Sequence, residues 1–327
     1  MTELLDAMVQ ARLPWVSGEI RSWYDDARLA ELVRSDLGPQ AAMVGDESFG
    51  AQFRANVGLD IGDASDWANR RVDHPDGGWA VCGIRYRGRD VERPFVEVVA
   101  TTEPPTPDGL AAVARVVVPL YATFHPLCLR VDAPDPAALV TALDDDPRFG
   151  VSGVDMHVVA APVPKLRAWD RVPAYDVVDL RVGDAQVMAR RVAEIYADLD
   201  SRNPALEQWA RPEGEGTMRA CADQGLLFEV VVDGHPSGVV AALREDAHGM
   251  SGFCVQEIVL DAAHQGRRLA PAVLQRLVDV LPAEDGDVLW GTIHPGNTPS
   301  LRNAASVGRR VVGGYVWVTP AELPGMP

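Results

Sequence analysis

One stretch decides the fold: residues 257–281, EIVLDAAHQGRRLAPAVLQRLVDVL. Residues 258–261 predict the end of a strand, and a helix is expected after a short loop centred on Gly266. The apolar face of that helix consists of Leu269, Val273, Leu274, Leu277 and Val278. A turn between a strand and a helix presents unpaired backbone N–H groups, and the helix dipole favours an anion above them. The stretch therefore predicts a phosphate-binding turn.

The composition is that of a globular protein with more than one domain. The chain has 327 residues, of which 47% are hydrophobic and 24% charged, so two domains can each bury a core. Its formal net charge of −17 disfavours nucleic acid and anionic membranes as partners and favours cationic ones.

Cysteine usage and the N-terminus predict a cytoplasmic protein. Cys82, Cys128, Cys221 and Cys254 form no Cys-x-x-Cys pair and lie in or near apolar runs, which indicates buried, reduced thiols. The first residues do not resemble a signal peptide, and no run of about 18 apolar residues predicts a membrane helix. No residues have the spacing of metal ligands, so no metal is expected.

The order of expected elements repeats in the two halves of the chain. A hairpin over residues 79–103, a helix over 108–121, a strand, a second helix and another strand make up the first half, and residues 176–318 contain a similar order. The repeat predicts an internal duplication. At the turn, however, the first half has Glu103 and Asp108, whose carboxylates would occupy the positive end of the helix and repel phosphate. The first half is therefore expected to be a degenerate copy.

Other segments give weaker signals. Residues 20–37 have helical spacing, and Gly38-Pro39 is expected to end that helix. Two prolines in residues 163–175 predict a linker, which divides the chain into domains 1–165 and 166–327. Residues 1–75 have no predicted role.

Residues 265–270, Gln-Gly-Arg-Arg-Leu-Ala, resemble the Gln/Arg-x-x-Gly-x-Gly/Ala loop of the Gcn5-related N-acetyltransferase (GNAT) superfamily, with Arg268 in the place of the central glycine. The resemblance covers residues 174–319, where the DGHPSGVV hairpin, the EIVLD strand and HPGNTPSLRNAASVG fall in the family's order. It implies an α/β (α+β) fold of two GNAT-like domains, each a mixed, mainly antiparallel sheet flanked by helices.

The resemblance also implies a site for acetyl-CoA as co-substrate. Residues 265–270 would cradle its pyrophosphate, and the strand before them would pair with its pantetheine arm, while Asn297 and Ser300 would start a helix beside that arm. The residues implied in cofactor binding are Ile258, Val259, Leu260, Gln265, Gly266, Arg267, Arg268, Leu269, Ala270, Asn297 and Ser300. Asn297 with Ser300 could equally be a simple helix start.

Three residues are candidates for the acid–base chemistry of acyl transfer. Glu257 is the candidate base, with a solvent-facing strand residue as the equally weighted alternative. His294, at the end of the next strand, could act as base or proton donor, and Tyr315 on the last strand is a further candidate donor. Ala304 stands where the family commonly has its general-acid tyrosine.

The sequence therefore predicts an N-acetyltransferase that moves an acetyl group to a primary amine by direct attack. A small cationic acceptor is expected from the acidic charge, and the degenerate half would shape the acceptor cleft or a homodimer. One alternative is a CoA-binding sensor or scaffold without catalysis, which Ala304 motivates. Another is a thiol-biosynthesis acetyltransferase that resembles mycothiol synthase.

Overall fold

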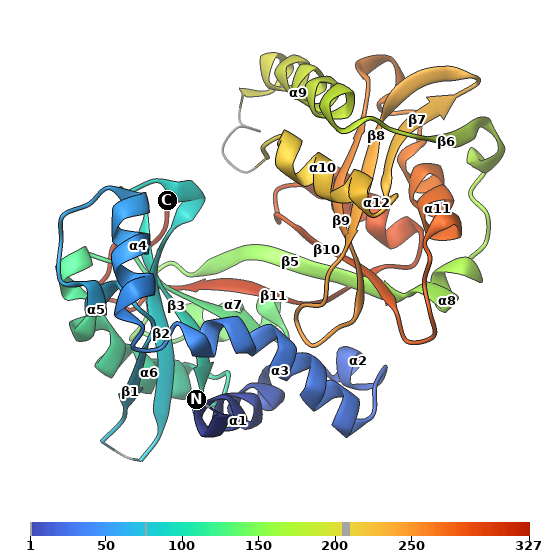
Figure 1. Cartoon of the computed structure of the whole chain (residues 1–327). Coiled ribbons are helices and arrows are strands. Elements are labelled where there is room, and N and C mark those ends of the chain that lie inside the picture. Colours follow the sequence, from blue (N-terminus) through green and yellow to red (C-terminus); the bar gives the residue numbers. More distant parts are fainter. Residues whose placement is uncertain (1, 76, 205–209) are drawn as a thin grey trace. The chain divides into compact units, whose positions relative to one another are not determined.

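The computed structural model describes residues 2–75, 77–204 and 210–327, which form two compact units (Figure 1). Unit 1 comprises residues 1–157, 247–250 and 312–327, and unit 2 comprises residues 158–246 and 251–311. Strands β5 (Gly153–Pro162) and β11 (Arg310–Val318) each have residues in both units. A single cut in the sequence therefore does not separate the units.

Unit 1 begins with helices and continues with strands and helices in alternation. Its elements before β5 are α1 (Thr2–Arg12), η1 (Leu13–Trp15), α2 (Gly18–Arg21), α3 (Asp26–Ala42), α4 (Glu47–Val57), α5 (Ala64–Trp67), β1 (Arg70–Asp73), β2 (Trp79–Tyr86), η2 (Arg87–Arg89), β3 (Pro94–Thr101), α6 (Pro107–Leu120), η3 (Ala122–Phe124), β4 (Leu129–Ala133) and α7 (Pro136–Asp144).

The predicted helix over residues 20–37 is wrong at both ends. The helix α2 ends at Arg21, and a separate helix, α3, begins after Asp25, whose side chain accepts a hydrogen bond from the backbone N–H of Arg28. Gly38-Pro39 does not end α3, which continues to Ala42. Proline costs a helix one hydrogen bond, but Leu37 and Ala41 on either side of Pro39 are buried, and their burial offsets that cost.

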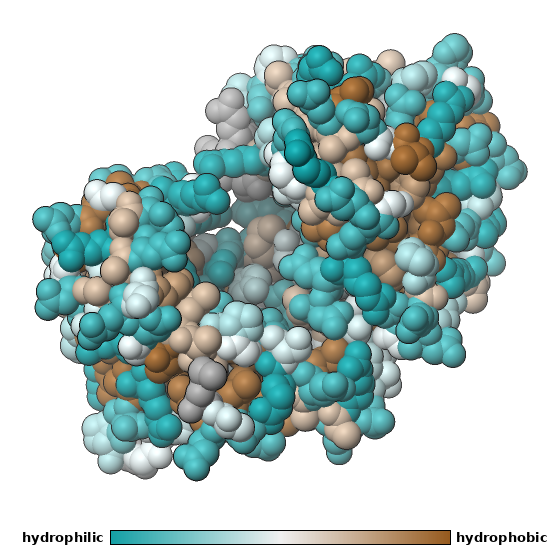
Figure 2. All heavy atoms as spheres, viewed as in Figure 1, coloured by the Kyte–Doolittle hydropathy of each residue, from teal (hydrophilic) through white to brown (hydrophobic). Residues whose placement is uncertain are grey.

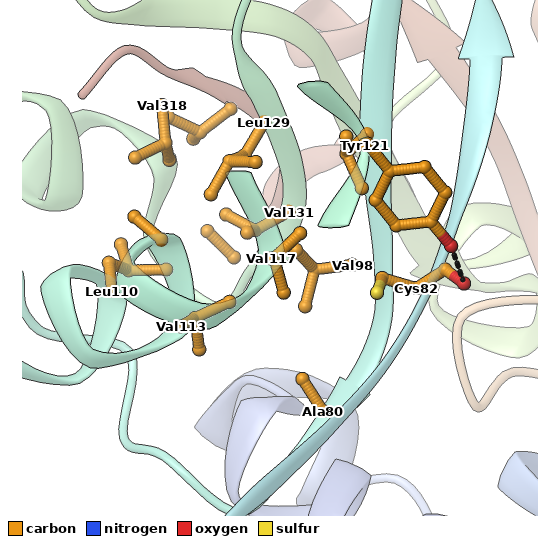
Figure 3. Packing of buried hydrophobic residues seen from close by; sticks show 14 of the residues in the cluster. Ala80, Cys82, Val98, Leu110, Val113, Val117, Tyr121, Leu129, Val131 and Val318 are labelled. Atoms are coloured by element: carbon orange, nitrogen blue, oxygen red, sulfur yellow. Dashed lines mark hydrogen bonds between the residues drawn. The ribbon is translucent and has the colours of Figure 1, made fainter. Parts of the chain in front are cut away.

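The sheet of unit 1 has the order β1-β2-β3-β4-β11. Only β3 and β4 pair in parallel; the other neighbours are antiparallel. Helix α6 packs Leu110, Val113 and Val117 on this sheet, and the Tyr121 hydroxyl donates to the Cys82 carbonyl over 2.9 Å (Figure 3). These buried residues lie on one face of the helix that was predicted over residues 108–121.

Unit 2 contains further strands of the 11-stranded sheet, with helices on both faces. Its further elements are α8 (Val163–Arg167), η4 (Tyr175–Val177), β6 (Val178–Val182), α9 (Ala185–Arg202), α10 (Glu215–Asp223), β7 (Leu227–Val232), β8 (His235–Arg244), β9 (Gly252–Leu260), η6 (Ala262–His264), α11 (Ala270–Val280), β10 (Val288–Ile293) and α12 (Thr298–Ser306).

The sheet of unit 2 has the order β10-β9-β8-β7-β6, in which β9 and β10 are parallel and the others antiparallel. One face packs against α11 through residues such as Val240 and Phe253. The other packs against α9 and α10 through residues such as Val239 and Val259, as Figure 1 shows. The alternation of buried residues on β8 and β9 separates the two cores.

Residues 163–175 are not a free linker. They contain α8, whose Val163 and Leu166 are buried in the core beneath α11, and the Arg167 guanidinium donates to the Leu281 carbonyl over 2.7 Å. The two prolines that suggested a linker instead lie at the start of α8 and ahead of η4, because proline is well tolerated at the first turn of a helix.

The predicted fold class is confirmed. In each unit, antiparallel strands precede a helix and a parallel strand, so the sheet is mixed and mainly antiparallel, with helices on it. Hydrophilic side chains cover most of both units in the view of Figure 2. None of the described helices has the length and apolar character to cross a membrane.

Candidate functional site

Strands β9 and β10 stop pairing part-way along their length. Their parallel register runs from Val288 opposite Gly252 to Trp290 opposite Cys254, and β9 continues to Leu260. The backbone groups of β9 that face away from β8 beyond this point are therefore open to a ligand. The predicted pantetheine-binding residues Ile258, Val259 and Leu260 all lie in this part of β9.

The orientation of the β9 backbone distinguishes these three residues. The carbonyl oxygen of Val259 points at β8, since it lies 2.2 Å from the position of a Cβ on Gly238, and Asp261 N–H donates to the carbonyl of Ser237, also on β8. By alternation, the backbone groups of Ile258 and Leu260 point away from β8. Ile258 and Leu260 can thus offer backbone groups to a ligand, whereas Val259 can offer only its side chain.

The loop from Gln265 to Ala270 ends in the N-terminus of α11. No side chain caps this helix, and Pro271 occupies its first turn. Among the described residues, no acceptor receives a hydrogen bond from the backbone N–H groups of Gly266, Arg267, Arg268, Leu269, Ala270 and Ala272. A run of free N–H groups at a helix N-terminus is an anion-binding concavity.

Arg268 adopts the backbone conformation of the glycine that it replaces. Its φ is 58°, in the left-handed region, and the φ of Gly266 is 72°. This conformation costs a non-glycine residue about 1 kcal/mol, but it leaves the N–H groups of the loop free. Arg268 therefore adds a cation to the loop while its backbone takes a conformation that glycine favours.

The side chains of the loop have separate roles. Arg267 and Arg268 are exposed, and neither guanidinium pairs with a carboxylate in the ranges that the structure describes, so both are available to phosphate. Gln265 instead supports the strand, because its Nε2 donates to the Leu260 carbonyl over 2.7 Å. Leu269 is buried beneath α11.

Glu257 is not a solvent-facing residue. Only 5% of it is exposed, and it lies near a register shift of β8 and β9, where Ala241 is opposite Glu257 but Ala242 is opposite Val255. Such a bulge re-aims side chains. Burial raises the pKa of Glu257 to about 7, which lets a carboxylate accept a proton near neutral pH.

Tyr196 on α9 belongs to this site, although sequence reasoning missed it. Its hydroxyl donates to Glu257 Oε1 over 3.4 Å, and the backbone N–H of Ile258 donates to the same oxygen over 2.9 Å. Burial raises the pKa of Tyr196 above its usual value. The sequence feature that could have identified Tyr196 is its helical spacing from Val192 and Ile195, which places it on the buried face of α9.

His294 follows the last residue of β10. Its Nδ1 accepts a hydrogen bond from the Gly296 backbone N–H over 3.1 Å. A neutral imidazole that accepts at Nδ1 carries its proton on Nε2. In that neutral form His294 presents an Nε2–H group, and its role as base or proton donor stays a prediction.

Asn297 caps α12, as the simpler alternative expected. Its side chain accepts from the Ser300 backbone N–H over 3.2 Å. Ala304 is buried, and the Trp169 ring fills the space beside Gly308, where a Cβ would lie 2.7 Å from the ring. The helix start is thus shown, and contact of Asn297 and Ser300 with CoA stays a prediction.

Tyr315 lies in unit 1. The Arg130 guanidinium lies 4.4 Å from its ring centroid, and His248 packs edge-on at 5.4 Å. Burial raises its pKa above the usual value. These contacts show a buried structural position, and its role as a proton donor stays a prediction.

The equivalent opening in unit 1 is filled by its own N-terminal segment. The pairing of β3 with β4 ends at Val98 and Val131, and Arg12 and Trp15 line the cavity beyond, which holds only about 10 Å³. The Arg12 guanidinium pairs with Asp132, and the Trp15 indole N–H donates to the Glu103 carbonyl over 3.1 Å. A cavity of this size holds about one water molecule.

The helix that follows β3 offers no open turn either. The Thr106 side chain caps α6 by accepting from Gly109 N–H over 3.3 Å, and Pro107 in the first turn has no N–H. Unit 1 thus lacks the free N–H groups found before α11. The capped turn agrees with the prediction that the first half is a degenerate copy.

No cluster of three or more His, Cys, Asp or Glu side chains in the described ranges could hold a metal ion. All four cysteines are buried and free. Burial raises the pKa values of Cys82, Cys128 and Cys221 to about 12, so these thiols remain protonated and unreactive.

Comparison with known proteins gives structural matches only. No family model matches the chain, and no curated protein does. A GCN5-related N-acetyltransferase from Sphaerobacter thermophilus is similar with a TM-score of 0.50 and 15% identity, over 85% of this chain and 92% of that one. This likeness shows the fold.

Two further solved structures are similar at lower scores. A GNAT-family acetyltransferase from Colwellia psychrerythraea matches with a TM-score of 0.47 and 10% identity, over 75% of this chain and 85% of that one. A tandem GNAT protein from the clavulanic acid biosynthesis pathway matches with a TM-score of 0.40 and 16% identity, over 75% of this chain and 79% of that one. At these scores neither likeness carries an argument.

Proposed function

The chain has the fold of the Gcn5-related N-acetyltransferases, and from this premise we propose that unit 2 transfers an acyl group from acyl-CoA to a primary amine. The observation that carries the proposal is the loop 265–270, whose free backbone N–H groups and unpaired arginines follow the part of β9 that extends beyond its pairing with β10. Acetyl-CoA is the donor that the sequence resemblance implies.

The phosphates of CoA would lie on the N–H groups of residues 266–272, with Arg267 and Arg268 adding charge-assisted hydrogen bonds. The pantetheine arm would pair with the open side of β9, where Ile258 and Leu260 present their backbone groups. Ile258 N–H donates to Glu257 Oε1, so a ligand that takes this N–H would remove one of the hydrogen bonds to the carboxylate.

Glu257 is the proposed base. An amine is protonated at neutral pH and must lose a proton to attack a thioester. The pKa of about 7 keeps a large fraction of Glu257 ionised at neutral pH and still basic enough to accept that proton. Protonated to the imidazolium, His294 can give a proton to the leaving thiolate, since position 304 carries alanine and no tyrosine.

The acceptor is proposed to be a small cationic molecule, because the chain carries a net charge of −17 and attracts cations. A macromolecular partner such as nucleic acid is disfavoured by the same charge. Association of two copies into a homodimer is tested by measuring the molar mass of the protein in solution.

The function is tested by mixing the protein with acetyl-CoA and a panel of polyamines, amino sugars and amino acids, and following release of free CoA thiol. Turnover that saturates with one class of amine is the expected result. Tight acetyl-CoA binding without turnover on any amine would favour the sensor or scaffold. Absence of both binding and turnover would contradict the proposal.

A further inference from the structure

One cation at the site has no carboxylate partner among the described residues. Arg309, which directly follows α12 and Gly308, is only 4% exposed. Its Nη2 donates to the Val159 carbonyl over 3.1 Å, whereas its Nε has no acceptor among the described residues. No carboxylate in those residues forms an ion pair with it. Burial lowers the pKa of Arg309 to about 10, so it remains charged at neutral pH.

The guanidinium lies where β9 and β10 begin to part. Its Nη2 is 3.1 Å from the position that a Cβ on Gly291 would occupy, and the next atoms there are the carbonyl oxygen and Cβ of Val255, at 3.5 and 3.7 Å. Gly291 and Val255 are the residues that directly follow the last parallel pair, Trp290 with Cys254. Because residue 291 is a glycine, no side chain of β10 separates the guanidinium from this vertex.

The face of the sheet tells which substrate would meet this cation. Val255 packs with the core beneath α11, whereas Glu257 lies on the face of α9 and contacts Tyr196. The proposed phosphate loop leads into α11, so the donor is expected to approach from the α11 side, and the amine from the side of Glu257. The cation at the vertex therefore faces the acyl donor.

A buried cation without a counter-charge is costly, by several kcal/mol per ion. Unit 1 shows that this chain can supply the missing charge, since Arg12 is buried against the carboxylate of Asp132. Arg309 has no such residue, and a ligand carboxylate is the group that fits a planar guanidinium best.

We propose that Arg309 binds a carboxylate at the far end of the acyl group, so that the preferred donor is the CoA thioester of a dicarboxylic acid, of the succinyl type. This inference rests on the proposed function and specifies its donor. Acetyl-CoA then occupies the same site without reaching Arg309 and binds through its CoA portion alone.

The test compares succinyl-CoA with butyryl-CoA, which has an acyl chain of the same length and a neutral end, by isothermal titration calorimetry. The intact protein is expected to bind succinyl-CoA about 10- to 100-fold more tightly, the range for a hydrogen-bonded charge pair. Arg309→Met should abolish this preference and leave the affinity for butyryl-CoA unchanged. Replacement of an unpaired buried charge by an apolar side chain should not lower Tm.

A second pair of variants keeps the test valid if Arg309→Met does not fold. Gly291→Asp would place a carboxylate of the chain next to Arg309, and Gly291→Asn would place an uncharged side chain of the same size there. Gly291→Asp should have the higher Tm of the two, and neither should prefer succinyl-CoA. A higher Tm for Gly291→Asn would contradict a partnerless Arg309.

The outcomes separate this inference from the function on which it rests. Equal affinities of the intact protein for the two thioesters would overturn the donor assignment while CoA binding stands. An equal loss of both affinities in Arg309→Met would also overturn it, since Arg309 would then act on the part that all acyl-CoA molecules share. Failure to bind any CoA thioester would overturn both proposals.

Discussion

Glu257 is the residue on which the proposed chemistry depends. Burial raises its pKa to about 7, so the folded protein favours the protonated form more than the unfolded chain does. The contribution of this group to stability is therefore greatest at low pH and is lost as the pH rises through 7. A position that costs stability at the working pH is typical of a functional group.

Activity should follow the ionisation of Glu257. Because only the carboxylate accepts a proton, the rate of the intact enzyme should rise as the pH passes about 7 and level off above it. Glu257→Gln should lower kcat by about 10²- to 10⁴-fold and remove this rise. The measurement is CoA thiol release between pH 5 and 9 with an amine that the intact enzyme accepts.

Tyr196→Phe is the matched control, since it keeps the ring and removes the hydrogen bond to Glu257. That hydrogen bond lowers the pKa of Glu257, so its loss should shift the rise to higher pH without abolishing activity. Full turnover and an unchanged pH profile in Glu257→Gln would show that another group is the base.

At this scale the sequence predicted what lies within one continuous segment. The loop 265–270 and Glu257 are only a few residues apart, and their residue types alone identified them as candidates, whose roles stay predictions. Tyr196 and Arg309 were missed because their contacts are with residues far away in the sequence. Tyr196 contacts the carboxylate of Glu257, and Arg309 contacts the Val159 carbonyl and lies beside Gly291. His248 likewise pairs with a distant residue, Asp132.

At the scale of elements, the N-terminal helix explains why unit 1 is degenerate. Helix α1 and η1 place Arg12 and Trp15 at the end of the β3–β4 pairing. Burial alone would raise the pKa of Asp132, but Arg12 and His248 hold it below its usual value. Residues 1–75, which had no predicted role, thus include the segment that closes the counterpart of the CoA site.

Removal of the Arg12 charge should destabilise unit 1. Arg12→Met leaves the buried Asp132 with His248 alone, and loss of one partner of a buried ion pair lowers the free energy of unfolding by about 3 kcal/mol. Urea denaturation followed by tryptophan fluorescence measures this change.

Arg219→Met serves as the control, because Arg219 pairs with Glu215 on the exposed surface of α10. Its effect should stay within about 1 kcal/mol. An equally small effect of Arg12→Met would mean that the Arg12–Asp132 pair does not hold α1 in place.

Local sequence patterns predicted the presence of helices and turns better than the residues at which the helices begin and end. The Asp233-Gly234 turn and the apolar face of α11 lie where the sequence placed them, since each is set by neighbouring residues. Helix α3 runs past Pro39, and residues 163–175 contain the packed helix α8, because local sequence signals do not report burial.

On the scale of the whole molecule, the two units share the order of hairpin, helix, strand, helix and strand from β2 and from β8 onward, and they differ at the turn and at the strand opening. In unit 2 the turn before α11 is uncapped and β9 is open beyond Cys254; in unit 1 the turn is capped and the opening is filled by Arg12 and Trp15. The account therefore predicts a single acyl-CoA site per chain, although the fold is duplicated.

Calorimetric titration of CoA into the intact protein and two glycine variants tests whether the loop 265–270 provides a single CoA site per chain. Gly266 and Gly225 have φ of 72° and 71° with open space around them, so aspartate at either position brings the same strain and the same charge. The account predicts one site per chain, retained in Gly225→Asp and weakened at least about 100-fold in Gly266→Asp by repulsion of the phosphates. Two sites per chain, or equal affinities of the two variants, would contradict it.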